Sequence, residues 1–556
     1  MKLQRASSAD VGWLAGAASG TIVLTWTGIR AIVDGVQPID ERAYFELRSR
    51  DVLTGDHPLL GLGSSAGGSA GDLHHPGPLL FDLLAVPVRL LGGPVGTTVA
   101  VVALHALSLW LAVLAVRRVG GPLAAAVSAV GAVVLAWTLG SDLLIDPWQP
   151  NVLVLPAYSL CAVTAAAAAG HERWLLVVVA LASLCAQTHL GYLLLSAVLV
   201  VVAATGAVVS ARMAQRPLPI GALSTSLALG VVLWAQPLWQ QFFGAGPGNL
   251  GRALGRAGDG SATYGPTLAT RLVAAVVAVP PAWLRPGYDV DPPQALTRVD
   301  NGTLTLDTSR LPSVAVSVTV LLVLVVAAVV LVRLAQRSAV AGVGVLFTVA
   351  ASATAASFVT LVVMPSDLFG VLVHKYRFLW PVAAFVSTSF AMAAVGILAN
   401  HRQVAKPLGY ALAGLAAVVA LANLPARLQT EEEGRFARRE IWPVIDELRE
   451  QVATLELTGP VVFDTERTPF PDYYLVNVTA ELDRRDVEVQ VTTPVSIGQF
   501  GRRRRADGSA ITELAVRAGA ELTDAPPGSR RVAYVEADRA ELSVAVYARP
   551  TPEGPG

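Results

Sequence analysis

Apolar stretches long enough to cross a lipid bilayer recur along this chain from about residue 11 to about residue 424. The composition agrees, since 53% of the residues are hydrophobic and only 15% are charged, whereas soluble globular chains carry about a quarter charged residues. We therefore expect a mainly α protein, a polytopic transmembrane helix bundle of about 11 helices.

The positions of the charges predict how the bundle is oriented. Lys2 and Arg5 precede the first apolar stretch, at about 11–33, which is long enough to span and lacks a small-residue cleavage site. We read it as a retained helix with a cytoplasmic N-terminus. The breaks after every second span carry cationic residues, as the positive-inside rule requires; these are Arg117, Arg118, His171, Arg173, Arg212, Arg216, Arg333, Arg337, Arg402 and Lys406. An odd number of helices then places the C-terminal part outside the cell.

Two apolar segments are too short for full spans. Residues 79–92 include Asp82 and Arg89 and predict an interfacial or half-inserted helix. If residues 268–284 crossed the membrane, the charge pattern of all later loops would be inverted. We therefore predict a re-entrant or surface helix for this segment.

The C-terminal part changes to polar sequence, so we predict a transmembrane domain at 1–424 and an extracytoplasmic soluble α/β domain at 425–556. Alternating patterns there predict strands and helices: strands at 460–464, 486–492, 531–536 and 541–548, and helices at about 437–456 and 510–520. The run Arg502–Arg505 is typical of a solvated loop, although it could also bind an anionic polymer or lipid.

Charge and cysteine content exclude some classes of protein. The net charge of zero argues against nucleic-acid binding, which needs a basic footprint. Cys161 and Cys185 both lie in apolar segments, where packing is the plain interpretation. The scarcity of lysine and the excess of Ala, Gly and Val suggest a GC-rich bacterial genome.

The first external loop concentrates residues capable of chemistry. It opens with Asp40 and Glu41 and closes with His74 and His75 before Pro76. A carboxylate at the membrane boundary can act as a general base or hold a metal ion, and histidines can bind a phosphate. The alternative is that Asp40 caps a helix running from about 41 to 53, but capping would not require the two histidines.

The next external breaks carry further polar groups. Asp142 and Asp146 lie in a short loop, where Asp146-Pro147 could equally be a turn and N-cap signal. With Asp40, they make an acid/base or metal site plausible. His189, between two helices, is more typical of packing than of ligand binding.

A cationic element lies at the external start of the tenth span. His374, Lys375 and Arg377 are flanked by aromatic residues, which suits either interfacial anchoring or a lipid phosphate. Because positive charge is disfavoured on this side, a bound anion is the better explanation.

Taken in order, these elements resemble the GT-C superfamily of polytopic membrane glycosyltransferases, in a bacterial, actinobacterial-like form. Asp40-Glu41 with Tyr44 is similar to the family's Asp-Glu-x-x-Tyr element, and His75-Pro76-Gly77-Pro78-Leu79 to its His-Pro-Pro-Leu element, from which Gly77 departs. The segment from Pro147 to Leu153 resembles a Trp-Asn-Pro-Asn-Leu-Leu pattern, with Gln149 in place of Asn after Trp148. The resemblance covers about residues 11–424, and it also takes in Gln187-x-His189 and His374–Pro381.

The resemblance implies an enzyme of the plasma membrane that uses a polyprenyl-phosphate sugar donor, a hexosyl- or pentosyltransferase acting on an envelope glycan, glycolipid or protein acceptor. Asp40 would be the main catalytic carboxylate, ahead of Glu41, and Asp146, or Asp142, the second acidic residue. The carrier phosphate would be neutralised by His374, Lys375 and Arg377. Further substrate contacts would come from His74, His75, Trp148, Gln149 and His189. No cofactor is certain; if a divalent cation such as Mg²⁺ or Mn²⁺ takes part, Asp40 and Asp146 would hold it.

Two alternatives to an active transferase stay open. A transporter or flippase of an envelope lipid or glycan precursor should carry ionisable residues in mid-membrane, whereas here His105 is an isolated case and the polar groups collect on one face. The other alternative is an inactive relative whose external domain binds glycan.

Overall fold

The computed structural model describes residues 8–64, 73–244, 248–257, 262–278, 282–284, 297–300, 303–306, 308–309, 311–366, 371–399, 402–424, 439–457, 459–465 and 473–551. The chain divides into two compact units. The helical unit comprises Met1–Gly28, Val101–Trp239 and Ala253–Thr430, and the loop–sheet unit comprises Ile29–Ala100, Gln240–Arg252 and Glu431–Gly556. The predicted domain boundary after residue 424 stays a prediction.

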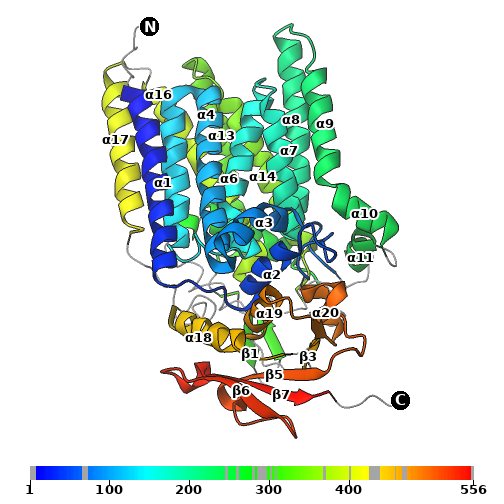
Figure 1. Ribbon diagram of the computed structural model, residues 1–556. Coiled ribbons are helices and arrows are strands. Elements are labelled where there is room, and N and C mark those ends of the chain that lie inside the picture. The colour runs from blue at the N-terminus through cyan, green and yellow to red at the C-terminus, as the bar shows by residue number, and fades with distance from the viewer. Residues whose placement is uncertain are drawn as a thin grey trace, which may run out of the picture. The chain divides into compact units, whose positions relative to one another are not determined.

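The helical unit is a bundle whose long helices lie side by side (Figure 1). Its α-helices are α1 (Ser8–Val33), α4 (Gly93–Leu139), α5 (Gln149–Val152), α6 (Val154–Ala168), α7 (Trp174–Thr188), α8 (Leu193–Met213), α9 (Ile220–Leu233), α10 (Ala235–Phe243), α12 (Gly265–Val277), α13 (Val314–Arg337), α14 (Val343–Val363), α15 (Val373–Tyr376), α16 (Leu379–Ala399) and α17 (Arg402–Leu421). The division assigns one end of α1, of α4 and of α10 to the other unit. Short 3₁₀ turns, η3 (Leu190–Tyr192) and η4 (Ala282–Leu284), and a hairpin of β1 (Thr297–Asp300) and β2 (Thr303–Leu306) complete it.

Among the described residues, eight helices are long and apolar enough to cross a membrane, or nine if α9 and α10, which meet at a 55° bend, form one span. Two more apolar helices, α7 and α12, are shorter. The 47-residue α4 is two helices that meet at Gly121, where φ is +77°. The break follows from the sequence, because glycine adopts positive φ readily and Pro122 cannot continue the hydrogen-bond ladder.

Small side chains allow the centre of the bundle to pack closely. Every residue of α6 is buried, and the helix contacts α7, α8, α14 and α16. Its second half is nearly all alanine, which lets neighbouring backbones approach; a Cβ on Gly206 of α8 would lie 2.5 Å from the Ala168 Cβ. Cys161 and Cys185 are buried and free, which confirms their packing role.

Residues 268–277 of the segment predicted at 268–284 belong to a buried helix, α12. In α12, Leu268 and Leu272–Val277 are buried, and the helix contacts α13, α14 and α16. The surface-helix alternative is therefore wrong, because the helix is enclosed by neighbours on several sides.

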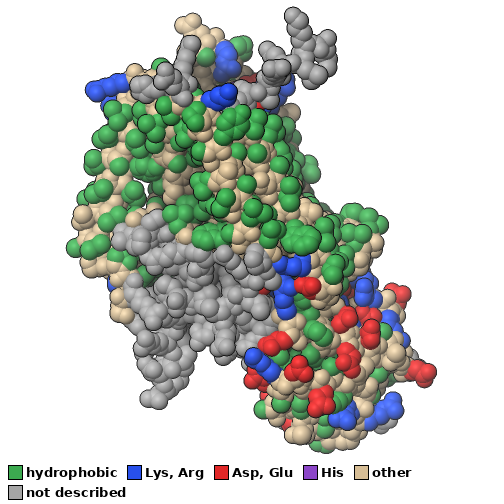
Figure 2. Space-filling view, turned by 90° about the vertical axis from the view of Figure 1, so that its left-hand side faces the viewer, with side chains coloured by type: hydrophobic (Ala, Val, Ile, Leu, Met, Phe, Trp, Pro, Cys, Tyr) green, Lys and Arg blue, Asp and Glu red, His purple; other side chains and the backbone are tan. Residues whose placement is uncertain are grey.

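The outer face of the helical unit is apolar. Figure 2 shows hydrophobic side chains covering this face and Lys and Arg side chains gathered at one end of it. The outward helix α13 is typical, with Leu322 and Val326 more than half exposed. A belt of this kind suits lipid, and the clustered charges match the positive-inside pattern. Which end faces the cytoplasm stays a prediction.

The loop–sheet unit combines the loop that follows α1 with the C-terminal part of the chain. Its helices are η1 (Asp40–Arg42), α2 (Ala43–Asp51), α3 (Leu79–Leu91), α11 (Gly248–Ala257, which the division splits after Arg252), η7 (Arg439–Ile441), α18 (Trp442–Ala453), α19 (Leu475–Arg484), α20 (Pro494–Phe500), η8 (Arg502–Arg504), η9 (Gly519–Glu521) and η10 (Ala540–Leu542). Its strands are β3 (Val461–Phe463), β4 (Val489–Val491), β5 (Thr512–Ala518), β6 (Arg530–Val535) and β7 (Val544–Pro550).

The five strands form one mixed sheet in the order β4-β3-β5-β7-β6. β3 pairs in parallel with β4 and β5, while β7 is antiparallel to β5 and β6. The α/β class and the four predicted strands are confirmed, and α18 lies inside the helix predicted at 437–456, whose first two residues fall outside the described part.

The helix predicted at 510–520 is wrong. Residues 512–518 form β5, the central strand, in which Leu514–Val516 and Arg517 are buried. Alanine and leucine are good helix formers, but helix propensity contributes only a little free energy per residue. Pairing with β3 on one side and β7 on the other outweighs that preference.

The close contact at Gly131 of α4 gives a test of this packing. A Cβ there would overlap the Thr388 methyl group of α16 and lie 2.9 Å from the Tyr158 hydroxyl oxygen of α6. We expect Gly131→Leu to lower the free energy of unfolding by about 1–3 kcal/mol through overpacking, measured by thermal unfolding in detergent. Gly344→Leu in α14 is the matched control, because a Cβ at Gly344 meets nothing within 4 Å. Equal effects of the two changes would contradict the packing described.

Candidate functional site

The Asp146 loop of the helical unit is a hydrogen-bonded turn. The two carboxylate oxygens of Asp146 accept bonds from the Trp148 backbone N–H at 2.9 Å and from the Asn151 side-chain amide at 2.8 Å. This confirms the turn interpretation of Asp146-Pro147. The N-cap interpretation is wrong, because Trp148 occupies the cap position of α5. Asp142 and Asp146 are both buried.

His105 braces this loop from α4. Its Nδ1 lies 3.1 Å from the Leu144 carbonyl oxygen and its Nε2 lies 3.1 Å from the Val152 carbonyl oxygen. The two carbonyls flank Asp146 in the sequence, so the ring contacts the loop on both sides and donates to one carbonyl from its single N–H. The sequence shows His105 only as an isolated polar residue in a span, and nothing in it signals this role.

The cationic turn, residues 374–377, adjoins the Asp146 loop. α15, which carries His374 and Lys375, contacts α5, which follows Trp148. The Trp148 and His374 rings lie 5.1 Å apart. Trp148, His374 and Lys375 are half-buried, whereas Arg377 is 2% exposed. The structure thus brings an acidic loop and a cationic turn together, with partly accessible side chains between them.

A polar and aromatic group from the α7–α8 connection joins the same cationic turn. The Tyr192 ring lies 6.0 Å from that of Phe378 and 6.1 Å from that of His189, whose Nδ1 accepts the Gly191 backbone N–H at 3.1 Å. In the part of the chain that the structure describes, the buried hydroxyls of Thr188 and Tyr192 have no hydrogen-bond partner. Such groups are rare, so both can serve a polar ligand. Tyr192 was not predicted, because a lone tyrosine in an apolar span carries no signal.

Gln149 and Gln187 are buried beside these elements. The Gln187 amide donates to the Leu233 carbonyl at 2.7 Å and so joins α7 to α9. The substrate roles of Gln149 and His189 stay predictions.

Asp40, in the loop–sheet unit, has a strained backbone. It begins η1 with φ of +55°, in the left-handed region that non-glycine residues seldom adopt. The cap positions of η1 and α2 are Ile39 and Arg42, so the alternative interpretation, in which Asp40 caps the following helix, is wrong. Strain at a half-buried carboxylate is typical of a functional position, where the surroundings hold an unfavourable conformation.

His74 and His75 lie on a short antiparallel bridge with residues 61–64. The His75 backbone N–H donates to the Leu62 carbonyl at 2.9 Å, and the His74 Nδ1 lies 3.1 Å from the Gly61 carbonyl oxygen. Burial, aided by the nearby charge of Arg48, lowers the pKa of His74 below its usual value. His74 is therefore neutral at pH 7, and if it binds a phosphate it does so by hydrogen bonding.

A pocket of about 350 Å³ lies elsewhere in the loop–sheet unit, between the residues that follow α1, the start of α4, and helices α18 and α19. Several of its polar side chains already bond one another: the Gln37 amide donates to Asp446 at 2.9 Å, and Arg484 pairs with Glu481 at 3.1 Å. We assign no substrate to it.

The described residues contain no group of three or more His, Cys, Asp or Glu side chains arranged to hold a metal ion. A metal role for Asp40 and Asp146 therefore has no support from a ligand cluster in these ranges. The chemistry proposed below uses the protein's own side chains.

No protein-family model and no curated protein matches this chain. Two crystal structures match it. ArnT from Cupriavidus metallidurans bound to undecaprenyl phosphate is 14% identical, with a TM-score of 0.55 over 97% of this chain and 98% of that chain. The same protein in the apo state is 13% identical, with a TM-score of 0.51 over the same shares. At this identity the likeness shows the fold. It confirms the predicted polytopic helix bundle with a small C-terminal strand domain, and it does not extend to an actinobacterial-like branch.

The strain at Asp40 predicts an unusual gain in stability. Because glycine accepts positive φ without cost, Asp40→Gly should raise the free energy of unfolding by about 0.5–1 kcal/mol. Glu41→Gly, at the next position of the same turn, should lower it by a similar amount. Thermal unfolding of both purified variants measures this, and a loss of stability in Asp40→Gly would show that Asp40 is not strained.

Proposed function

We propose that this protein is a glycosyltransferase of the bacterial plasma membrane that moves a sugar from a polyprenyl-phosphate donor to an envelope glycan, glycolipid or protein. In this proposal the N-terminus is cytoplasmic and the C-terminal domain is extracytoplasmic. The sugar is a pentose such as arabinose or a hexose such as mannose.

One observation carries the proposal: the acidic Asp146 loop adjoins the cationic turn through the 5.1 Å contact of Trp148 with His374. A sugar linked to a lipid phosphate needs both kinds of group. Cationic side chains neutralise the phosphate, and oriented acceptors bind the sugar hydroxyls. The half-buried aromatic surface of Trp148 suits the apolar face of a sugar ring or of the first prenyl unit.

The structural likeness to ArnT supports the choice of donor. That protein was crystallised with undecaprenyl phosphate, and the chain described here has the same fold along nearly its whole length. A carrier of this class would lie with its tail against apolar helices and its phosphate at the cationic turn.

The reaction would be a single displacement. The acceptor hydroxyl attacks the anomeric carbon while Asp40 takes its proton, and the bond from that carbon to the phosphate oxygen breaks with inversion. The polyprenyl phosphate leaves with its electron pair and is neutralised by His374, Lys375 and Arg377. Because this leaving group is already an anion, it needs positive charge more than a proton.

The structure also bears on the transporter alternative. His105 is the mid-membrane residue that could have indicated an ion pathway, but both of its ring nitrogens face carbonyls of the Asp146 loop. Its position is explained by bracing, so it does not favour transport.

Loss of the Asp40 carboxylate charge gives the first test of the reaction. Asp40→Asn keeps the shape of the side chain but cannot accept the proton, so transfer from a polyprenyl-phosphate sugar should fall by about 10²–10⁴-fold. Glu41→Gln removes the neighbouring carboxylate and should stay within about threefold of wild type. Unchanged turnover in Asp40→Asn would exclude Asp40 as the base.

Removal of a charge from the cationic turn should weaken the donor complex. A charge-assisted contact to phosphate is worth about 1.5–3 kcal/mol, so Lys375→Gln should raise KM for the lipid donor by about 10–100-fold. The matched control is Lys406→Gln, a change at another lysine of the helical unit, in α17. If both variants keep the wild-type KM, the donor phosphate does not bind at Lys375.

A further inference from the structure

Helix α2, which follows Asp40 and Glu41, buries acidic side chains. The Glu46 side chain is fully buried, and the Asp51 side chain is 6% exposed. A buried carboxylate is costly unless it is paired and hydrogen-bonded. The partners of these two residues therefore decide how this helix is held.

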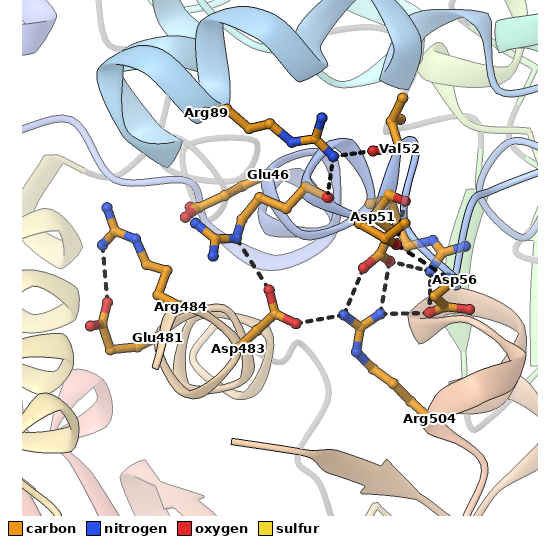
Figure 3. Close-up of polar contacts among 12 residues, drawn as sticks. Glu46, Asp51, Val52, Asp56, Arg89, Glu481, Asp483, Arg484 and Arg504 are labelled. Atoms are coloured by element: carbon orange, nitrogen blue, oxygen red, sulfur yellow. Dashed lines mark hydrogen bonds and ion pairs between the residues drawn. The ribbon is translucent and has the colours of Figure 1, made fainter. Parts of the chain in front are cut away.

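Both partners come from the C-terminal part of the same unit. Arg449 of α18 donates from one nitrogen to both Glu46 oxygens, at 2.8 Å each. Arg504 of η8 binds Asp51 with two nitrogens on two oxygens, again at 2.8 Å each. Figure 3 shows Arg504 reaching up to Asp51 from beneath α2. Bidentate pairs of this kind fix orientation as well as distance.

Arg504 belongs to a neutral network of three arginines and three aspartates. It also contacts Asp483 at 2.9 Å and Asp56 at 3.0 Å (Figure 3). Arg48, which pairs with Asp56, and Arg50, which pairs with Asp483, complete the set. Although burial acts to lower the pKa of Arg504, its hydrogen bond to Asp51 and the charges of Asp51, Asp483 and Asp56 raise it above the usual value. Arg504 therefore stays charged. The prediction that the run Arg502–Arg505 is a solvated loop holds for three of its residues, since Arg502, Arg503 and Arg505 are exposed. It is wrong for Arg504, which is buried.

A third contact fixes the chain on the other side of Asp40. The Asn477 amide of α19 donates to the Pro38 carbonyl at 2.8 Å, and both residues are buried. Pro38 precedes Asp40 by two residues, whereas Glu46 follows it by six. The strained residue is thus held from both directions by α18 and α19, as a sparsely populated conformation requires.

We propose that Arg449 and Arg504 are positioning residues, through which the C-terminal domain holds α2 and the Asp40 turn in the conformation used for sugar transfer. This assigns the domain a role in catalysis without contact to substrate, and that part rests on the proposed function. The contacts themselves do not depend on it.

Hydrogen exchange of residues 38–51 combined with transfer kinetics tests the proposal on the full-length protein in nanodiscs. In Arg504→Gln, exchange in this segment should rise at least tenfold and kcat should fall about tenfold or more, while KM for the donor stays within about twofold. Arg504→Lys keeps the charge but not the two-pronged geometry and should be intermediate in both. Arg503→Gln, at the exposed neighbour in the same run, should change neither.

If Arg504→Gln does not fold, Arg504→Lys and Arg449→Lys decide the question, because both retain the buried charge. Unchanged exchange in residues 38–51 would overturn the proposal, and so would raised exchange with wild-type kcat. If the wild-type protein transfers no sugar, the proposed function fails by itself; exchange then still decides whether the C-terminal domain holds Asp40.

Discussion

The loop–sheet unit depends on the pairing of buried carboxylates in α2 with arginines more than 400 positions further along the chain. A fully buried Glu46 could not be tolerated alone, since an unpaired buried charge costs several kcal/mol. The Glu46–Arg449 and Asp51–Arg504 pairs therefore join the loop that follows α1 and the C-terminal part of the chain into a single folded unit. The position of the Asp40 turn within that unit follows from them.

In the helical unit, a polar loop that contains Asp146 is held among apolar helices. Alanine and glycine let α6 pack tightly among its neighbours. Within the Asp146 loop, the Asp146 carboxylate accepts hydrogen bonds from the Asn151 side chain and from the Trp148 backbone. His105 contacts this loop on both sides of Asp146. The cationic turn then lies against a loop with one fixed shape.

The sequence predicts the class of this fold well because membrane-spanning length and apolar composition leave little choice. It also predicts the acidic loop and the cationic turn, since charged residues outside the spans stand out. The sequence predicts poorly the elements whose conformation depends on residues distant in the chain. The residues of β5 predict a helix because alanine favours helices locally, whereas pairing with β3 and β7 makes this segment a strand. Capping by Asp40 stays an open alternative in the sequence, because its positive φ becomes visible only in the structure. Arg504 reads as part of a solvated run because its partners Asp51 and Asp56 are some 450 positions away.

In the proposed reaction this protein breaks the bond between a sugar and a polyprenyl phosphate. Purified protein in nanodiscs, given a polyprenyl-phosphate sugar, should release free polyprenyl phosphate in an amount equal to the sugar that appears on the acceptor. The transferred sugar should have the inverted anomeric configuration. Movement of intact donor between leaflets without any release, across both pentose and hexose donors, would contradict this reaction and favour a flippase.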